Sequence, residues 1–214
     1  MSTSHHPSPA RDPREFWENH YTEHRDRFAG NPNRLALDHL EDLEPGRALE
    51  IGCGQGADAI WLAQRGWTVL AVDLAEAILR VAEDRCREAG VADRITWRRH
   101  DLSAGVPEGA FHLVLSSYTQ SPVALERIAV LRQAADRVAP GGVLLIVGHA
   151  GNPSWAPEQD HGVAMPDAAT LVASLDLPSG DWTVDHQEDV ARDSPAPDGR
   201  PGTRLDAVVR LRRR

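Results

Sequence analysis

The chain has 214 residues, is 41% hydrophobic and carries a formal net charge of −9, and all 23 of its Lys and Arg positions are arginine. The absence of lysine excludes a P-loop phosphate site, a Schiff-base enzyme and a conventional pyridoxal phosphate enzyme. The acidic balance argues against nucleic acid as a partner, and the two cysteines, Cys53 and Cys86, lack the spacing of metal ligands. We therefore expect no metal site.

Length and composition indicate one domain. Residues 1–13 are polar and contain prolines, so we expect a disordered tail there and a single domain over residues 14–214. No apolar run reaches the length of a membrane span, and the first residues lack the apolar core of a signal peptide. We therefore expect a cytoplasmic protein without a membrane partner, either a monomer or a homodimer.

The segment at residues 14–43 carries the pattern of two helices. Aromatic and histidine residues, Trp17 and Tyr21 among them, recur every three or four positions over residues 14–28, which predicts an amphipathic helix. A second helix is expected after the Asn-Pro-Asn turn at residues 31–33. This segment is a candidate lid over a ligand, and a helix pair that only packs on the core is an equally good interpretation.

The middle of the chain alternates between short apolar strands and helices. The predicted strands are residues 48–51, 68–72, 95–99, 111–115 and 143–147. The helices between them are predicted at residues 57–65, up to residue 89, and at 122–138, with a turn at 140–142 before the last of these strands. Such alternation predicts a parallel sheet with helices on both faces.

The alternation changes after residue 147. A helix is predicted near residues 167–175, followed by strands at 182–190 and 205–212. Because their connection is too short for a crossover helix, the last two strands are expected to pair antiparallel. The predicted fold is therefore a Rossmann-like α/β fold with a mostly parallel, seven-stranded sheet and an antiparallel C-terminal strand.

Ligands of such sheets bind at the carboxyl ends of the strands. Glu50 stands near the end of the first strand, before a glycine turn at residues 52–56 whose amides can hold a carboxylate or phosphate. The second strand leads to Asp73, which can accept both hydroxyls of a ribose. The third leads to Asp101, which can accept an adenine amino hydrogen, although a turn cap is an equally good reading.

Glu50 distinguishes between two nucleotide cofactors that fit this pattern. A carboxylate near the glycine turn would repel the pyrophosphate of a dinucleotide, whereas it would attract the sulfonium and ammonium groups of S-adenosylmethionine. The acids Glu50, Asp73 and Asp101 therefore favour S-adenosylmethionine, and a nicotinamide dinucleotide is the alternative.

These motifs resemble a family. The order Glu50-x-Gly52-x-Gly54-x-Gly56, Asp73, Asp101-Leu102 and a Pro-Gly-Gly turn resembles the class I S-adenosylmethionine-dependent methyltransferases over roughly residues 14–212. The segment Phe16-Trp17-Glu18-x-x-Tyr21 and residues 56–63 are similar to small bacterial tellurite-resistance and thiopurine methyltransferases. One departure is His112, which stands where the family commonly has an aspartate, and we expect it to alter packing or a surface contact.

The resemblance implies S-adenosyl-L-methionine as the cofactor and S-adenosyl-L-homocysteine as its product. Gly52, Cys53 and Gly54 would contact the methionine part through the main chain, Asp73 the ribose, and Asp101 with Leu102 the adenine. The full set of expected cofactor-binding residues is Trp17, Tyr21, Glu50, Gly52, Cys53, Gly54, Gly56, Asp73, Leu74, Asp101, Leu102, Ser116 and Ser117.

Methyl transfer is an in-line displacement, for which positioning alone can supply about 7–11 kcal/mol. Two candidate catalytic residues follow the fourth and fifth strands: Tyr118, which would orient the acceptor, and His149, which would act as a base. A packed tyrosine and a capping histidine are the structural alternatives. We expect a small-molecule acceptor with a soft S, Se or Te centre; an O- or N-methyltransferase of a specialised metabolite, or a non-catalytic S-adenosylmethionine-binding protein, are the alternatives.

Overall fold

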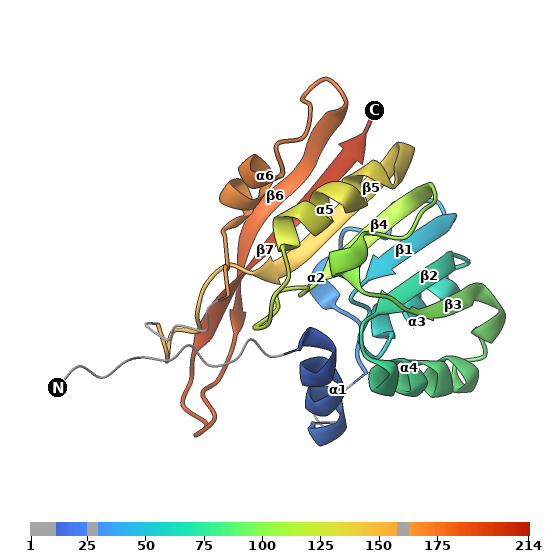
Figure 1. Cartoon of the computed structure of the whole chain (residues 1–214). Helices are drawn as coiled ribbons and strands as arrows, with labels where there is room; N and C mark the ends of the chain where they lie inside the picture. The colour runs from blue at the N-terminus through green and yellow to red at the C-terminus, as the bar shows by residue number, and fades with distance from the viewer. Residues whose placement is uncertain (1–11, 25–29, 158–162) are drawn as a thin grey trace.

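The computed structural model describes residues 12–24, 30–157 and 163–214. Within these residues the strands form one seven-stranded sheet in the order β3-β2-β1-β4-β5-β7-β6, with helices on both faces (Figure 1). The strands are β1 (Arg47–Ile51), β2 (Thr68–Asp73), β3 (Ile95–Arg99), β4 (Phe111–Ser117), β5 (Val138–His149), β6 (Trp182–Asp193) and β7 (Thr203–Arg213). The helices are α1 (Pro13–Glu23), α2 (Arg34–Leu37), α3 (Ala57–Gln64), α4 (Glu76–Glu88), η2 (Ala92–Arg94), η3 (Leu102–Ala104), α5 (Arg127–Asp136) and α6 (Ala168–Leu175).

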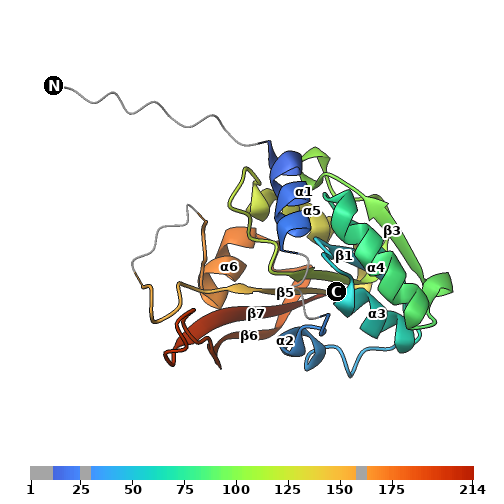
Figure 2. The same ribbon diagram turned by 90° about the horizontal axis from the view of Figure 1, so that it is seen from below.

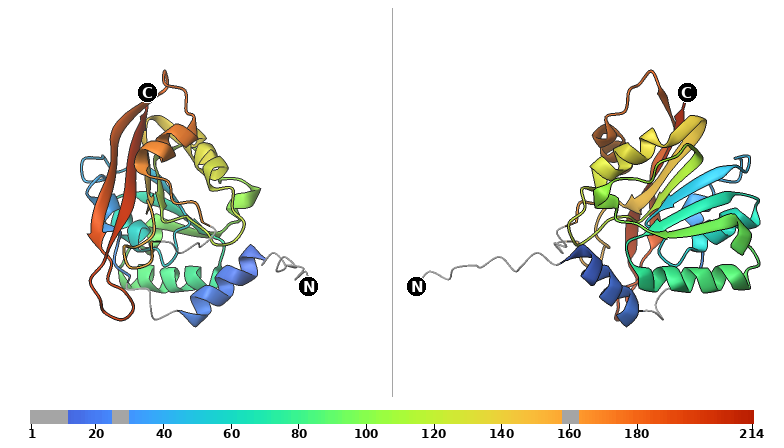
Figure 3. Two further views of the ribbon diagram at one scale, coloured as in Figure 1. Left: turned by 90° about the vertical axis from the view of Figure 1, so that its left-hand side faces the viewer. Right: turned by 45° about the vertical axis from the view of Figure 1, so that its right-hand side comes forward.

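The strand pairing confirms the predicted sheet. β1 pairs in parallel with β2 and β4, and the parallel pairing continues to β3 and β5. β7 then pairs antiparallel with both β5 and β6. The carboxyl ends of the parallel strands lie at the same end of the sheet. The hairpin of β6 and β7 extends past them on the side where α1 lies (Figure 3).

Two apolar layers hold the helices on the sheet. Leu62 of α3 and Leu79 of α4 pack on one face, while Leu131 of α5 and Leu171 of α6 pack on the other. Figure 2 shows α2 and α6 on opposite sides of β5 and β7. Because Leu131 is fully buried, its truncation to alanine is expected to cost about 2–5 kcal/mol. The strand ends are thus fixed by a well-packed core.

The N-terminal helices are shorter than the sequence pattern predicts. α1 begins at Pro13 because the Asp12 side chain accepts hydrogen bonds from the amides of Arg14 and Glu15, so the predicted tail does not reach residue 13. The remainder of that tail, at residues 1–11, lies outside the described residues, as do residues 25–29 of the first predicted helix. The second predicted helix is a single turn, α2, capped by the Asn33 side chain.

Two further boundaries differ from the prediction. α5 begins at Arg127 rather than near residue 122, because the Ser121 hydroxyl accepts a hydrogen bond from the Val123 amide and turns the chain. The predicted turn at residues 140–142 lies inside β5, which pairs irregularly with β4 at this end. His112 makes the expected surface contact, since its Nδ1 accepts a hydrogen bond from the Arg47 amide at 3.0 Å. In the described part of the chain, no helix combines the length and apolar character needed to cross a bilayer.

Candidate active site

A cavity opens at the carboxyl ends of the parallel strands, beneath α1. It contains about 630 Å³ of empty space, a volume that includes open solvent. Of the residues predicted from the sequence, those that border it are Trp17, Tyr21, Gly52, Asp73, Leu74, Asp101, Leu102 and Tyr118. Pro13, His100, Thr119, Gln120, Ser121, Ala124 and Leu125 complete its lining. Sequence spacing thus identifies much of the lining, whereas Ser121, Ala124 and Leu125 are added by the structure.

Close packing explains the glycines of the turn between β1 and α3. Gly52 and Gly56 have φ angles of 67° and 75°, a region that side-chain-bearing residues rarely adopt. A Cβ atom at Gly52 would lie 2.8 Å from Thr119 Cγ2, and one at Gly56 would lie 2.2 Å from Trp97 Cη2. Glycine is therefore required both by the backbone conformation and by the neighbouring side chains.

The amides of this turn are largely occupied by the protein itself. The Cys53 amide donates to the Val72 carbonyl, and the Gly54 amide donates to Asp73 Oδ2, each at 2.9 Å. The Gly56 amide donates to the Cys53 carbonyl. The Cys53 and Gly54 amides therefore fasten the turn to β2, and contact of the Gly52, Cys53 and Gly54 main chain with the methionine part of the cofactor stays a prediction. Among the glycines of the turn, Gly52 is the one that borders the cavity.

Asp73 connects the glycine turn to the cavity. Its Oδ2 accepts from the Gly54 amide, and its Oδ1 accepts from the Ala75 amide at 3.1 Å. Burial raises the pKa of Asp73, and the hydrogen bonds from the Ala75 and Gly54 amides oppose that rise. Each carboxylate oxygen keeps a second lone pair. The side chain can therefore accept two further hydrogen bonds from neighbouring hydroxyls.

Asp101 both caps a turn and borders the cavity. Its Oδ1 accepts hydrogen bonds from the amide and the hydroxyl of Ser103, at 2.8 and 2.6 Å. The capping interpretation is therefore confirmed for this oxygen. Since Asp101 and Leu102 also border the cavity, contact with an adenine stays a prediction that the geometry permits.

Glu50 and Cys53 lie behind the cavity rather than in its wall. Glu50 is buried, and its Oε2 has no hydrogen-bond partner among the described residues. Burial, followed by the nearby carboxyl of Asp58, raises the pKa of Glu50 well above its ordinary value. Burial likewise raises the pKa of the Cys53 thiol. Glu50 does not border the cavity, so its contact with a cationic ligand stays a prediction. The raised pKa of Cys53 argues against an activated thiol.

The two serines at the end of β4 also point away from the cavity. Ser116 is fully buried, and its hydroxyl lies 2.8 Å from Thr119 Oγ1. The Ser117 hydroxyl donates to Asp58 Oδ2 at 3.0 Å, and Asp58 Oδ1 accepts from the Asn33 amide at 2.6 Å. Neither serine borders the cavity. They hold the loops around it, and Asp58 ties the N-terminal segment to α3.

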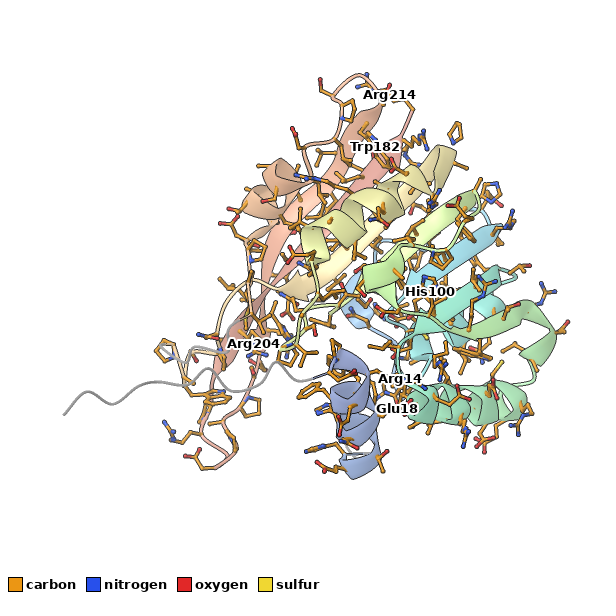
Figure 4. All side chains as sticks on the ribbon, in the orientation of Figure 1. Arg14, Glu18, His100, Trp182, Arg204 and Arg214 are labelled. Atoms are coloured by element: carbon orange, nitrogen blue, oxygen red, sulfur yellow. The ribbon has the colours of Figure 1, made fainter. Side chains whose placement is uncertain are left out.

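A single carboxylate docks α1 over the site. Glu18 accepts hydrogen bonds from the amides of Glu76 and Ala77, at 2.7 and 3.0 Å. These amides open α4, whose own N-cap residue, Ala75, provides no side-chain cap, so Glu18 supplies the missing cap from another helix. Glu18 lies between α1 and α4 (Figure 4). Sequence reasoning noticed Glu18 only as part of a motif and gave it no role.

The two candidate catalytic residues share one buried partner. The Tyr118 hydroxyl donates to Asp206 Oδ2 at 2.8 Å, and His149 Nδ1 donates to Asp206 Oδ1 at 2.7 Å. The two rings lie 4.7 Å apart between centroids. Of the two candidate catalytic residues, Tyr118 borders the cavity and His149 does not. Burial and the Asp206 carboxylate raise the pKa of Tyr118, which therefore stays protonated near neutral pH.

Asp206 is the functional residue that sequence reasoning missed. It is fully buried in β7 and forms an ion pair with Arg192 of β6. Burial alone would raise its pKa, but hydrogen bonds from His149, Arg192 and Tyr118 bring the pKa of Asp206 below its ordinary value. On the other side of the imidazole, Arg204 Nη1 lies 3.2 Å from His149 Nε2. The network thus fixes the histidine tautomer and ring orientation.

The charges of the cavity distinguish between the two cofactors that the sequence pattern allows. Its lining, as formed by the described residues, contains the acids Asp73 and Asp101 and no arginine. The histidine of the lining, His100, has its Nε2 only 2.7 Å from the Gly105 carbonyl oxygen. A pyrophosphate would find no cationic partner there, whereas a sulfonium nucleoside fits this donor and acceptor set.

Comparison with known proteins agrees with this geometry. Residues 48–142 match a family described as a methyltransferase domain. Over these residues the chain is similar to methyltransferases. The match extends from β1 into β5 and includes the glycine turn between β1 and α3.

Two curated relatives illustrate the sequence similarity. The chain is 28% identical over 143 residues to a 2-heptyl-1-hydroxyquinolin-4(1H)-one methyltransferase of Mycobacteroides abscessus, covering 65% of this chain and 60% of that protein. It is 36% identical over 115 residues to a ubiquinone biosynthesis O-methyltransferase of Paracidovorax citrulli, covering 52% and 48% of the two chains. The chain thus spans about half the length of these relatives.

Solved structures share the fold along nearly the whole chain. TehB from Haemophilus influenzae superposes with a TM-score of 0.72 at 16% identity, covering 92% of this chain and 67% of TehB. The N-methyltransferase NodS from Bradyrhizobium japonicum, solved with S-adenosyl-L-homocysteine, gives a TM-score of 0.65 at 21% identity, covering 94% and 99%. At these identities the likeness concerns the fold.

Proposed function

We propose that this protein transfers the methyl group of S-adenosylmethionine to a small-molecule acceptor. The observation that carries the proposal is the cavity at the strand ends, with Asp73 and Asp101 in its wall and no arginine among the described residues that line it. Bound there, the cofactor supplies an electrophilic methyl group on a sulfonium. In this proposal the acceptor enters from the side of Thr119, Gln120, Ser121, Ala124 and Leu125, which also line the cavity.

The residues of the chain contribute binding and orientation. Asp73 accepts hydrogen bonds from the ribose hydroxyls with the lone pairs that the Gly54 and Ala75 amides leave free. Leu74 and Leu102 offer apolar contact to the adenine, and Trp17 of α1 shields the site from water. Holding acceptor, methyl carbon and sulfur in line can contribute about 7–11 kcal/mol without any proton transfer.

The protonation state of Tyr118 in the cavity wall favours a methyl acceptor that needs no general base. Tyr118 keeps its proton because burial and Asp206 raise its pKa. The other acids of the wall serve the cofactor in this proposal. A soft S, Se or Te centre is nucleophilic without the help of a strong base. We therefore favour such a centre as the methyl acceptor, in line with the similarity to tellurite-resistance and thiopurine methyltransferases.

A second candidate is an O- or N-methyltransferase of a specialised metabolite. The pairing of His149 with Asp206, next to the Tyr118 ring, is the observation that favours it. For His149 to act as a base, Tyr118 would have to shift on acceptor binding and Arg204 would have to leave His149 Nε2. That nitrogen could then remove a proton from a hydroxyl or amine. The ubiquinone O-methyltransferase among the relatives makes this chemistry plausible for the fold.

Transfer from labelled S-adenosylmethionine tests both candidates. The protein is incubated with a panel of thiols, selenite, tellurite, phenols and amines, and labelled products are separated by chromatography. Methylation of thiols that survives His149→Ala supports the soft-acceptor proposal. Methylation of phenols or amines that falls at least about a hundredfold in His149→Ala, the usual contribution of a general base, supports the second candidate. Cofactor binding without transfer to any acceptor or to a cell extract would favour a non-catalytic binding protein.

A further inference from the structure

A second cavity adjoins the first. It lies between the loop that leads into α5 and residues 163–174, and the two cavities share Gln120, Ser121, Ala124 and Leu125 in their walls. A molecule in the second cavity would therefore reach the first along this common wall. The arrangement has the form expected for an acceptor site next to a cofactor site.

The second cavity is bordered by a partly buried cation that has no acidic partner among the described residues. Arg127 is the first residue of α5, and its Nη2 atom is buried with no hydrogen-bond partner among the described residues. Its Nε lies 3.4 Å from Thr119 Oγ1, a long hydrogen bond. Burial lowers the pKa of Arg127 to about 10, so the guanidinium remains charged near neutral pH. A buried cation normally has an anionic partner.

No acid in the described part of the chain supplies that partner. The neighbouring Glu126 borders the same cavity, but the ion pairs between described residues include none that involves Arg127. The acids Asp73 and Asp101 belong to the first cavity, which Arg127 does not border. Among the described residues, the charge of Arg127 therefore has no acidic partner.

The surroundings of Arg127 hold it in place. A Cβ atom at Gly148 would lie 2.9 Å from Arg127 Nη2 and 3.0 Å from Gln120 Oε1, so both side chains pack closely against this glycine. The Gln120 amide in turn pairs with the main chain of His149: Oε1 accepts from its amide at 2.9 Å, and Nε2 donates to its carbonyl at 2.7 Å. The wall beside the guanidinium is therefore pre-organised.

We propose that Arg127 binds a carboxylate of the methyl acceptor, so that the substrate class is a small organic acid that carries the nucleophile. This inference rests on the proposed function. A guanidinium matches a carboxylate through two parallel hydrogen bonds and fixes its orientation, which would hold the nucleophile toward the shared wall. The methionine carboxylate of the cofactor has the same chemistry, and the experiment separates the two sources.

The test compares a matched pair of probes, 2-mercaptobenzoate and thiophenol, which differ in a carboxylate. Calorimetry measures the binding of S-adenosylhomocysteine to the wild type and to Arg127→Met, and then the binding of each probe to the S-adenosylhomocysteine complex. We expect the wild type to bind 2-mercaptobenzoate at least tenfold more tightly than thiophenol. Arg127→Met should erase that preference and leave the affinity for S-adenosylhomocysteine within twofold.

Two further variants control for structural effects. Arg127→Lys keeps the charge and should retain part of the preference. Arg132→Met removes another arginine of α5, one that donates to the Ser174 and Leu175 carbonyls, and should leave the preference intact. The melting temperature of Arg127→Met should stay unchanged or rise, because an unpaired buried charge is removed.

Three outcomes would overturn the inference. One is equal binding of the two probes by the wild type, and another is a fall of several degrees in the melting temperature of Arg127→Met, which would indicate a structural role. The third is a tenfold loss of S-adenosylhomocysteine affinity in Arg127→Met with the probe preference intact, which would assign Arg127 to the cofactor. Failure of the wild type to bind S-adenosylhomocysteine at all would instead contradict the proposed function itself.

Discussion

His149 Nδ1 and Asp206 Oδ1 lie 2.7 Å apart although 57 positions separate the two residues in the chain. The antiparallel pairing of β5 with β7 places them directly opposite each other. Since the same carboxylate accepts from the Tyr118 hydroxyl and pairs with Arg192, Asp206 orients both candidate catalytic side chains. It is a positioning residue for the wall of the cavity.

Replacing Asp206 by asparagine tests this network. Asp206→Asn removes the buried negative charge and leaves Arg192 and His149 without their anionic partner, so we expect a loss of about 3 kcal/mol in the free energy of unfolding. Urea unfolding followed by circular dichroism measures it. The control is Asp193→Asn, an exposed acid of β6, which should change stability by less than about 0.5 kcal/mol. Equal effects of the two variants would contradict the assignment.

The Asp206 network also predicts how the stability of the protein depends on pH. The pKa of Asp206 is lowered in the folded protein, so its stabilising contribution is present above the unfolded pKa and is lost as pH falls through the folded pKa. Unfolding experiments below about pH 4, the ordinary pKa of an aspartate, should therefore show a steeper loss of stability in the wild type than in Asp206→Asn. Parallel curves for the two proteins would argue against a depressed pKa.

The docking of α1 depends on Glu18. Glu18→Ala removes the cap that the Glu76 and Ala77 amides receive, and we expect the loss of about 1 kcal/mol typical of a helix cap. Because α1 carries Trp17 and Tyr21 into the cavity wall, calorimetry should also show weaker binding of S-adenosylhomocysteine. Glu15→Ala, which alters an exposed acid of the same helix, should leave binding unchanged. If both variants bind equally well, α1 is not a lid.

Gly56 and Gly90 form a matched pair of left-handed glycines, with φ angles of 75° and 71°. A Cβ atom at Gly56 would meet the Trp97 ring at 2.2 Å, whereas one at Gly90 meets nothing within 4 Å. Gly90→Ala should therefore cost only the backbone strain of about 1–2 kcal/mol. Gly56→Ala should cost clearly more, because the Trp97 ring must also move. Thermal unfolding compares them, and similar melting temperatures would refute the close packing of the turn.

For Glu50 we expect the opposite dependence of stability on pH from that of Asp206. Burial raises its pKa in the folded protein, so its contribution to stability is present below the unfolded pKa of about 4.3 and is lost as pH rises through the folded pKa. Glu50→Gln removes this titration. Its free energy of unfolding should fall less steeply with rising pH than that of the wild type, by up to about 1.4 kcal/mol per pH unit. Identical slopes above pH 5 would mean that Glu50 ionises normally.

The alternation of apolar strands and helices in the sequence predicts the fold well, because the same alternation builds the sheet and the helices packed on it. The predicted strand at residues 95–99 coincides with β3, and the short connection between β6 and β7 correctly indicates their antiparallel pairing. Turns are harder to predict from the sequence. The Ser121 hydroxyl accepts a hydrogen bond from the Val123 amide, and α5 begins later than predicted. Hydrophobic periodicity does not reveal such a contact.

The candidate site is predicted less completely, for a physical reason. Asp73 and Asp101 follow strands directly, so their position in the sheet fixes where they lie. Asp206 and Arg127 instead act through partners far away in the chain, and nothing in their immediate sequence signals burial. Ser116, Ser117 and Glu50 stand at the expected strand ends but do not border the cavity. Ser116 and Glu50 are buried, and the Ser117 hydroxyl is held by Asp58.

Binding of the methyl donor tests the central claim most directly. S-adenosylhomocysteine is titrated calorimetrically into the wild type and into Asp73→Ala, with circular dichroism to confirm that the variant is folded. We predict saturable binding by the wild type and at least a tenfold loss of affinity in Asp73→Ala, because the acceptor for the ribose hydroxyls is removed. Unchanged affinity in Asp73→Ala, or binding of NAD in place of S-adenosylhomocysteine by the wild type, would contradict the account.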